Sequence, residues 1–234
     1  MDGLGASLLT AVDLIVHLDR EMVQIIVLTF QVNVLAALIG CAIAFPLGAA
    51  VAVLRFPGRG LAIALLNAGM SLSGVVIGLV VYLILSRSGP LGGWGLLFSP
   101  TAMVIAQVVM ITPIVAALTC QTVADLDQKY DEQLRSLGAG RLRKMLTLLW
   151  DGRFSLVTAA LAGFGRALAE VGTVMIVGGN IAHHTRVMTN AIMLETDKGD
   201  LPLAVALGIV LLLLTLVVTL LIEGVREVAS RRYA

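Results

Sequence analysis

The sequence predicts an all-α protein: a bundle of about five helices that cross a membrane. Of its 234 residues, 59% are hydrophobic and 13% are charged, against about 25% charged in an average soluble domain. Mean hydropathy is +0.99. A soluble domain of this size cannot bury so much apolar surface, because its core grows slowly relative to its surface. The composition therefore excludes a disordered chain, an ordinary soluble enzyme and a disulfide-rich secreted domain.

Neither the net charge of +1 nor the two cysteines indicate a nucleic-acid partner or a metal site. A near-neutral chain gives no electrostatic reason to expect a nucleic acid. Cys41 and Cys120 both lie in apolar runs without neighbouring metal ligands, so we expect small packing residues.

Residues 1–21 are predicted to be an extracytoplasmic or interfacial segment. They have no basic start, and Asp13, His17 and Asp19 interrupt their apolar stretch, unlike a typical signal peptide. Residues 7–17 could form a short helix on the membrane surface, too short to span it.

The transmembrane domain is predicted over residues 22–222, followed by a tail over 223–234. Its first apolar run, 22–54, has no charged residue and would form one helix of about 50 Å, with a bend at Pro46. The other predicted spans are 61–85, 101–124 with a kink at Pro113, 154–181 and 201–222.

The basic residues predict the orientation. In alternate connections, eleven of the 16 lysines and arginines fall on one side and four on the other, and the richer side is cytoplasmic. The N-terminus is therefore expected outside and the C-terminus inside. The connection 125–153 is then cytoplasmic, and it holds Lys129, Arg135, Arg141, Arg143, Lys144 and Arg153.

This connection is predicted to form an amphipathic helix. Asp125 or Asp127 could cap its start, and Gly138 and Gly140 would end it. Its apolar stripe consists of Leu126, Tyr130, Leu134 and Leu137. The stripe needs a surface to cover it: the membrane, the chain's own bundle or a groove on a partner.

The connection also resembles the coupling loop of ABC-transporter permeases. That loop has Glu-Ala-Ala, three residues, a glycine, nine more residues and Ile-x-Leu-Pro. Glu132 and Gly138 match its Glu and Gly in spacing. The departures are Gln133 and Leu134 for the alanines, Leu148 for Ile, and Trp150 and Asp151 for Leu-Pro.

The fourth predicted span makes the resemblance specific. Residues 163–181, GFGRALAEVGTVMIVGGNI, resemble the oxyanion branch of these permeases, which imports sulfate, molybdate and tungstate. Residues 67–92, 101–119 and 185–209 most resemble the tungstate-type permease, with molybdate or sulfate as the alternative substrate. The resemblance covers nearly the whole chain after residue 22.

The resemblance implies a type I importer permease in a prokaryotic plasma (inner) membrane. Such a permease pairs with a second copy and with two cytoplasmic ATPases that bind ATP and Mg²⁺. An extracytoplasmic binding protein delivers tungstate. The chain itself would bind no cofactor or metal. The residues expected to couple to the ATPase are Asp131, Glu132, Leu134, Gly138 and Ala139.

Two charges stand inside the fourth predicted span. Each costs on the order of 2.5–3.5 kcal/mol at mid-bilayer. On a continuous helix, the spacing of Arg166 and Glu170 puts them on one face. They could form a structural ion pair. Alternatively, Arg166 could attract a dianion along the path, with Glu170 weakening its pull.

Small residues concentrate in the same span and in Gly74-x-x-x-Gly78 of the second. They predict close helix packing, or a hinge at Gly178–Gly179, where the helix should break. Asn180 could cap the freed backbone or meet substrate. The candidates along the path are Arg166, Glu170, Thr173, Gly178, Gly179 and Asn180.

The outer connections suggest no metal site. His183 and His184 are adjacent, so they do not share a helix face, and no third ligand stands near. The charged residues expected in solvent, or against a binding protein, are Glu195, Asp197, Lys198 and Asp200. Tyr82, Trp94 and Phe98 fit a position at the membrane interface.

No catalytic motif occurs: the sequence lacks GxxxxGK[ST], HExxH and GxSxG. Transport energy must therefore come from a partner. Two competing classes are an intramembrane enzyme, against which the missing nucleophile–base pair argues, and a passive anion channel.

Overall fold

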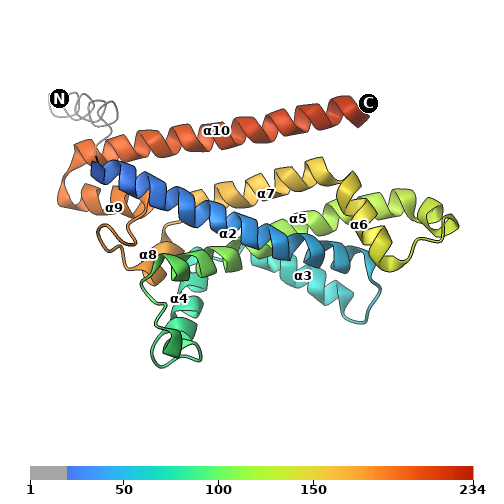
Figure 1. Ribbon diagram of the computed structural model, residues 1–234, viewed down its shortest axis with the longest axis horizontal. Helices are drawn as coiled ribbons and strands as arrows, with labels where there is room; N and C mark the ends of the chain where they lie inside the picture. The colour runs from blue at the N-terminus through green and yellow to red at the C-terminus, as the bar shows by residue number, and fades with distance from the viewer. Residues whose placement is uncertain (1–19, 234) are drawn as a thin grey trace. The chain divides into compact units, whose positions relative to one another are not determined.

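The computed structural model describes residues 20–233, without the side chains of 226 and 228–233. This part of the chain contains helices and no strand, as the sequence predicts (Figure 1). The predicted surface helix over 7–17 lies outside the described residues. The helices are α2 (Arg20–Val53), α3 (Arg59–Met70), α4 (Gly74–Leu85), the 3-10 helix η1 (Gly92–Trp94), α5 (Pro100–Ser136), α6 (Arg141–Asp151), α7 (Arg153–Leu168), α8 (Gly172–Gly178), α9 (Met188–Lys198) and α10 (Leu201–Tyr233).

Three of the described helices are long and apolar enough to cross a membrane on their own: α2, α5 and α10. Helices α2 and α5 run without a break through Pro46 and Pro113. Two bent pairs, α3 with α4 at 105° and α6 with α7 at 74°, raise the number to five if each pair makes one span. The predicted number of about five agrees with this upper count.

The predicted spans 61–85 and 154–181 are not continuous helices in the structure. In the first, the N–H groups of Ser71 and Leu72 bond only three residues back, to Ala68 and Gly69. Ser73 is then extended, with φ −68° and ψ 132°, so the helical ladder cannot continue. The second predicted helix breaks between α7 and α8.

The polar connection 125–153 is more helical than the sequence suggests. Helix α5 continues to Ser136, so Asp125 and Asp127 lie inside it and cap no helix start; that prediction is wrong. The helix continues because Leu126, Tyr130 and Leu134 pack against a buried cluster. The stripe is thus covered by the chain's own bundle, except for Leu137, which lies beyond the helix and is exposed.

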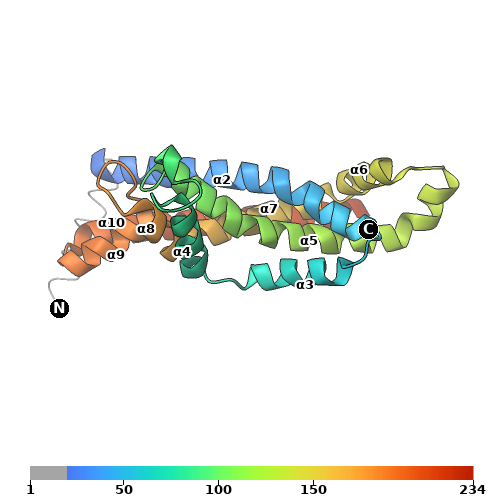
Figure 2. The same cartoon turned by 90° about the horizontal axis from the view of Figure 1, so that it is seen from below.

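The chain divides into two compact units. The first comprises Met1–Leu35, Ser73–Gln107 and Ala167–Val218. One part of its core joins the start of α2 to α9 and α10, through Met22, Ile25, Met188, Ala191, Ala206 and Leu207. In Figures 1 and 2, α4 and α8 of this unit lie side by side.

The second unit comprises Ala36–Leu72, Val108–Arg166 and Thr219–Ala234. Its core joins the end of α2 to α5 and α6, through Ala49, Val51, Ala52, Cys120, Val123 and Leu148. Cys120 is a buried free thiol in this cluster, which confirms its predicted packing role.

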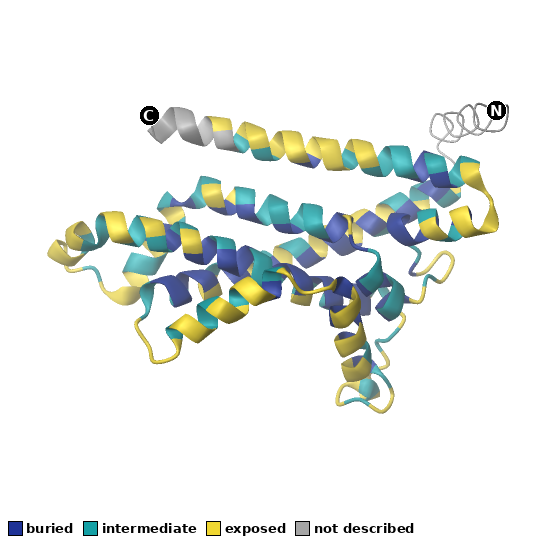
Figure 3. Cartoon of the chain, turned by 180° about the vertical axis from the view of Figure 1, so that it is seen from behind, coloured by how far each residue is buried: buried dark blue, intermediate teal, exposed yellow. Residues whose placement is uncertain are grey.

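Large apolar side chains remain exposed on several helices. Between residues 212 and 221, α10 is mostly exposed (Figure 3), including Leu212, Leu213, Leu216 and Val217. A soluble monomer rarely exposes such a continuous apolar surface, whereas a helix that faces lipid or another subunit does so at no cost.

Candidate functional site

Arg166 and Glu170 fall on either side of a helix end. Helix α7 ends at Leu168, so Arg166 lies in its last turn and Glu170 in the break. The prediction that both share one helix face is therefore wrong. The break is stabilised because Oε1 of Glu170 accepts the backbone N–H of Thr173, at 3.1 Å. This bond satisfies one of the free donors at the start of α8.

The Glu170 carboxylate is buried in a small polar site between α4 and α8. Its residue is 7% exposed. The Thr173 hydroxyl lies 3.3 Å from Oε1 and donates to the backbone oxygen of Gly74, at 2.7 Å. The Thr189 hydroxyl donates to the backbone oxygen of Glu170, at 3.0 Å. These bonds tie α4, α8 and α9 to the break.

Glycines let α4 and α8 approach this closely. A Cβ on Gly74 would overlap the Glu170 carboxylate, and a Cβ on Gly78 would lie 3.0 Å from Cα of Thr173. A Cβ on Gly172 would lie 2.6 Å from Cγ2 of Val75. The predicted close packing of small residues is confirmed at these positions.

The helical structure breaks again after α8, as predicted. Gly179 and Asn180 both have positive φ, 70° and 50°. Thr185, which the sequence analysis missed, closes this turn: its buried hydroxyl donates to the oxygen of Gly178 at 2.6 Å and accepts the N–H of Ile181 at 3.0 Å. Asn180 is not the cap. Its Oδ1 is buried without a hydrogen-bond partner among the described residues.

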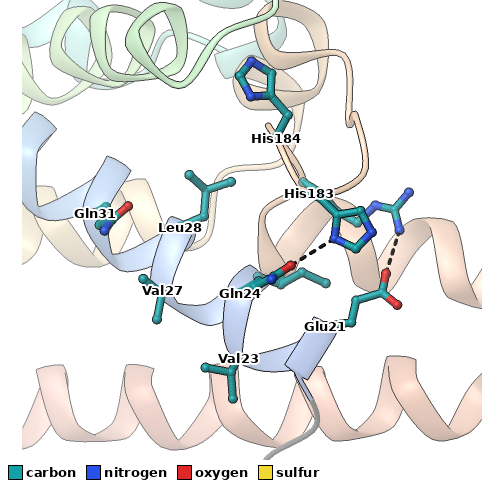
Figure 4. A pocket seen from close by; sticks show the side chains of 10 residues that line it. Glu21, Val23, Gln24, Val27, Leu28, Gln31, His183 and His184 are labelled. Atoms are coloured by element: carbon teal, nitrogen blue, oxygen red, sulfur yellow. Dashed lines mark hydrogen bonds and ion pairs between the residues drawn. The ribbon is translucent and has the colours of Figure 1, made fainter.

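A cavity of about 370 Å³ lies between the first turns of α2 and the loop before α9 (Figure 4). Nδ1 of His183 and Oε1 of Gln24 are 2.9 Å apart across it. Its lining residues are Glu21, Val23, Gln24, Ile25, Val27, Leu28, Gln31, His183, His184 and Arg186. No group of three or more potential metal ligands occurs in the described part of the chain.

An ion-pair network borders this cavity. Arg186 is largely buried and lies 3.3 Å from Glu21 and 3.7 Å from Glu195. Lys198 pairs with Glu195 at 2.9 Å. Glu195 was expected in solvent, but it is 5% exposed. That prediction is wrong, because two cations from the same network compensate its burial.

Removing the buried member of this network should cost stability. We expect Arg186→Met to lower the free energy of unfolding by on the order of 2 kcal/mol, since it leaves Glu195 with one cation at a half-exposed position. Lys198→Met, on the exposed partner, should cost less than about 1 kcal/mol. Thermal unfolding in detergent compares the two variants, and equal losses would contradict the assigned role of Arg186.

A second network braces the end of α5 against α6. Nζ of Lys144 contacts Asp127 and lies 2.6 Å from Asp131, which also pairs with Arg135 at 3.1 Å. The hydrogen bond from Lys144, with the attraction of Lys144 and Arg135, lowers the pKa of Asp131. Burial acts against the charged form of Lys144, but the two aspartates outweigh it and raise the pKa of Lys144.

We call the contacts of Lys144 with Asp127 and Asp131 the brace. The two pKa shifts determine the pH range over which the brace stabilises the protein. The lowered pKa of Asp131 gives stability above about pH 4, lost as the pH falls through the folded value. The raised pKa of Lys144 gives stability below about pH 10.5, lost as the pH rises through its folded value. We expect Lys144→Met to speed hydrogen exchange of α6 between these limits. Arg143→Met, on an exposed residue of α6, should leave it unchanged; equal acceleration in both variants would contradict the brace.

The five predicted coupling residues occupy different environments around one turn. Glu132 and Gly138 are exposed, whereas Leu134 is half-buried against the unit's own core. Asp131 belongs to the brace. The N–H groups of Gly138 and Ala139 bond to the oxygens of Arg135 and Leu134, both at 3.0 Å. Gly138 has φ 69°, which ends the helix as predicted.

Three buried amides in the first unit escaped the sequence analysis. Asn33, Gln107 and Asn190 are at most 4% exposed. Oδ1 of Asn33, Oε1 of Gln107 and both side-chain atoms of Asn190 have no hydrogen-bond partner among the described residues. An amide inside an apolar run was the available signal, because polar groups at membrane depth are costly and often functional.

Known proteins are similar to this chain over almost its full length. The family described as "Binding-protein-dependent transport system inner membrane component" matches residues 23–234. The chain belongs to this family. It is therefore an inner-membrane permease of the ABC-transporter class, as the resemblance of its connection 125–153 and its fourth predicted span implies.

Three relatives of the permease have names that state a substrate class. The tungstate uptake permease TupB of Peptoclostridium acidaminophilum is 36% identical over 227 residues, covering 97% of this chain and all of the relative. A probable anion permease of Haloferax volcanii is 37% identical over 200 residues, covering 83% and 86%. TupB of Campylobacter jejuni is 38% identical over 150 residues, covering 64% and 63%.

In the permease, the sequence-predicted residues therefore separate into two groups. Glu170 and Thr173 meet at the α4–α8 contact, and Gly178 to Asn180 form the end of α8. Arg166 belongs to the other unit, as do the residues of the α5–α6 turn.

Proposed function

We propose that this permease is the membrane subunit of an ATP-driven tungstate importer. One observation carries the proposal: 36% identity to a tungstate uptake permease extends over 97% of this chain and the whole of that relative. The path would be formed by two copies of the chain. Molybdate and sulfate, which are also tetrahedral dianions, are the alternative substrates.

The energy would be supplied by two cytoplasmic ATPase subunits that bind ATP and Mg²⁺, so the permease itself has no catalytic role. A tungstate-binding protein would deliver the ion on the opposite, extracytoplasmic side. The N-terminus lies outside and the C-terminus inside in this proposal, because the side with eleven basic residues is cytoplasmic.

The turn between α5 and α6 would contact the ATPase. Glu132 and Gly138 are exposed there, so both are accessible to a partner. The Asp131–Lys144 brace makes the turn part of a rigid two-helix element. A movement imposed by the ATPase would therefore reach the membrane through α5 and α7, rather than being absorbed by a flexible loop.

Arg166 would attract tungstate along the translocation path. Glu170, Thr173 and the end of α8 would determine the geometry of the neighbouring break between α7 and α8. A conducting site must bind an anion strongly enough to admit it and weakly enough to release it. Arg166 supplies a cation in the last turn of α7, and Glu170 would moderate the field that the anion meets. Asn180 would contact the ion through its side-chain N–H groups, because the amide nitrogen donates hydrogen bonds to an anion and the amide oxygen does not.

Neutralising Arg166 tests this role. We expect Arg166→Gln to lower the rate of tungstate uptake on the order of tenfold, because the anion loses its attracting charge. Arg166→Lys, which keeps the charge, should retain more of the rate. Uptake is measured in proteoliposomes at equal amounts of assembled transporter. An Arg166→Gln permease that assembles normally and transports at the wild-type rate would refute the role.

Reconstitution tests the function itself. The permease is purified from native membranes with whatever accompanies it, and the complex is placed in proteoliposomes with its binding protein. We expect a cytoplasmic ATPase to copurify and uptake of tungstate to require ATP. If the complex prefers molybdate or sulfate, that ion is the substrate in place of tungstate. Tungstate flux through the permease alone, without ATP, would indicate a channel and refute the pump.

A further inference from the structure

Helix α6 has two apolar faces. One packs into the core of the second unit through Leu148, with Met145 and Leu149 beside it. The other consists of Leu142, Leu146 and Trp150, spaced four residues apart and 70%, 60% and 72% exposed. We call these three residues the outer stripe. Exposed apolar residues at this spacing form a continuous face on a helix.

Cations flank the outer stripe. Arg141 and Arg143 are exposed at the start of α6. At its end, the guanidinium of Arg153 lies 5.2 Å from the ring centre of Trp150 and 4.8 Å from that of Phe154. Lys144, by contrast, faces the α5 brace. The stripe therefore lies beside arginines, an arrangement that suits an anionic surface with an apolar interior.

The angle between α6 and α7 fits such a surface. The two helices are separated only by Gly152, and the chain bends by 74° between them. Figure 1 shows the bend. Membrane helices tilt by about 20° from the bilayer normal. If α7 enters the membrane in this way, α6 lies nearer to the membrane plane than to the bilayer normal. Helix α7 also has an exposed apolar side chain near its start, since Val157 is 44% exposed.

We propose that α6 lies in the interface of the cytoplasmic leaflet, with its outer stripe at the boundary between headgroups and acyl chains. Arg141, Arg143 and Arg153 would bind the phosphates of anionic phospholipids. The side of the membrane rests on the topology in the proposed function. Trp150 suits this depth, because indole rings with adjacent cations favour the membrane interface. The ATPase would then contact the exposed end of α5 and not the outer stripe.

Trp150 can report its own depth. The chain has two tryptophans, so Trp94→Phe leaves Trp150 as the only one. The full permease with its ATPase is placed in nanodiscs of phosphatidylcholine and phosphatidylglycerol, brominated either near the headgroup or deep in the acyl chain. We expect shallow bromines to quench Trp150 about twice as strongly as deep ones, as a helix about 5–10 Å into the boundary requires. Iodide in solution should quench it weakly.

Variants of the outer stripe and of the arginines that flank it provide a second test. Leu142→Gln should shift the Trp150 emission to longer wavelength and weaken bromine quenching, whereas Ser136→Gln, at the exposed end of α5, should not. Arg141→Gln with Arg143→Gln should remove the dependence of quenching on phosphatidylglycerol. Strong iodide quenching without the ATPase, abolished when the ATPase binds, would overturn the proposal and assign the stripe to that partner. This result is distinguishable from loss of transport, which tests the proposed function alone.

Discussion

Gly74→Ala is expected to disrupt the α4–α8 contact more than a Gly→Ala substitution at any other described glycine. The new Cβ would overlap the Glu170 carboxylate, which is buried and bonded to the N–H of Thr173. Either α4 moves away or the carboxylate leaves its partner. Overpacking and the loss of a buried hydrogen bond together cost about 3 kcal/mol.

Thermal unfolding of the purified permease in detergent measures this loss, and tungstate uptake measures its effect on function. Gly208→Ala is the matched control. It lies in α10 of the same unit, and a Cβ there would meet nothing within 4 Å, so its stability should be unchanged or slightly raised.

A double variant separates the clash from other causes. Glu170→Ala removes the carboxylate that the new methyl group would strike. If the clash is the cause, Gly74→Ala should cost less in the Glu170→Ala background than in the wild type, because the two changes act on one contact. Equal costs in both backgrounds would show that Gly74 is needed for a different reason.

The sequence could predict the membrane class because apolar length alone determines it. Helix α2 and the apolar part of α5 match the predicted runs closely. The breaks at 71–73 and 169–171 were not predictable in the same way, since only Ser71 and Ser73 mark the first and only Glu170 marks the second within otherwise apolar runs. The second is stabilised by Glu170, whose buried position requires Gly74, a residue far away in the sequence.

The site residues show the same division. Gly138 was predicted from a local rule, since a glycine commonly ends a helix with positive φ. Thr185 and Glu195 were not, because their roles depend on partners that only the fold brings near. Glu195 looks like a solvated loop charge in the sequence, but Arg186 and Lys198 compensate it in a buried position.

The second large effect is expected from Gly138→Pro at the turn between α5 and α6. Gly138 has φ 69°, whereas the proline ring holds φ near −65°. Proline also removes the N–H that bonds to the oxygen of Arg135, at 3.0 Å. The turn must therefore open, and the exposed end of α5 with Glu132 loses its fixed position relative to α6.

If this turn transmits the ATPase movement, Gly138→Pro should abolish ATPase copurification and reduce ATP-driven tungstate uptake by at least about tenfold. Insertion in the membrane should be retained, because the apolar runs are unchanged. Gly138→Asn is the matched variant, since asparagine tolerates positive φ, and it should keep most of the coupling. Gly140→Ala is the neutral control, as Gly140 has φ −65° and open space for a Cβ. A Gly138→Pro permease that still binds its ATPase would place the coupling contact elsewhere, and α6 with its outer stripe would be the first surface to test.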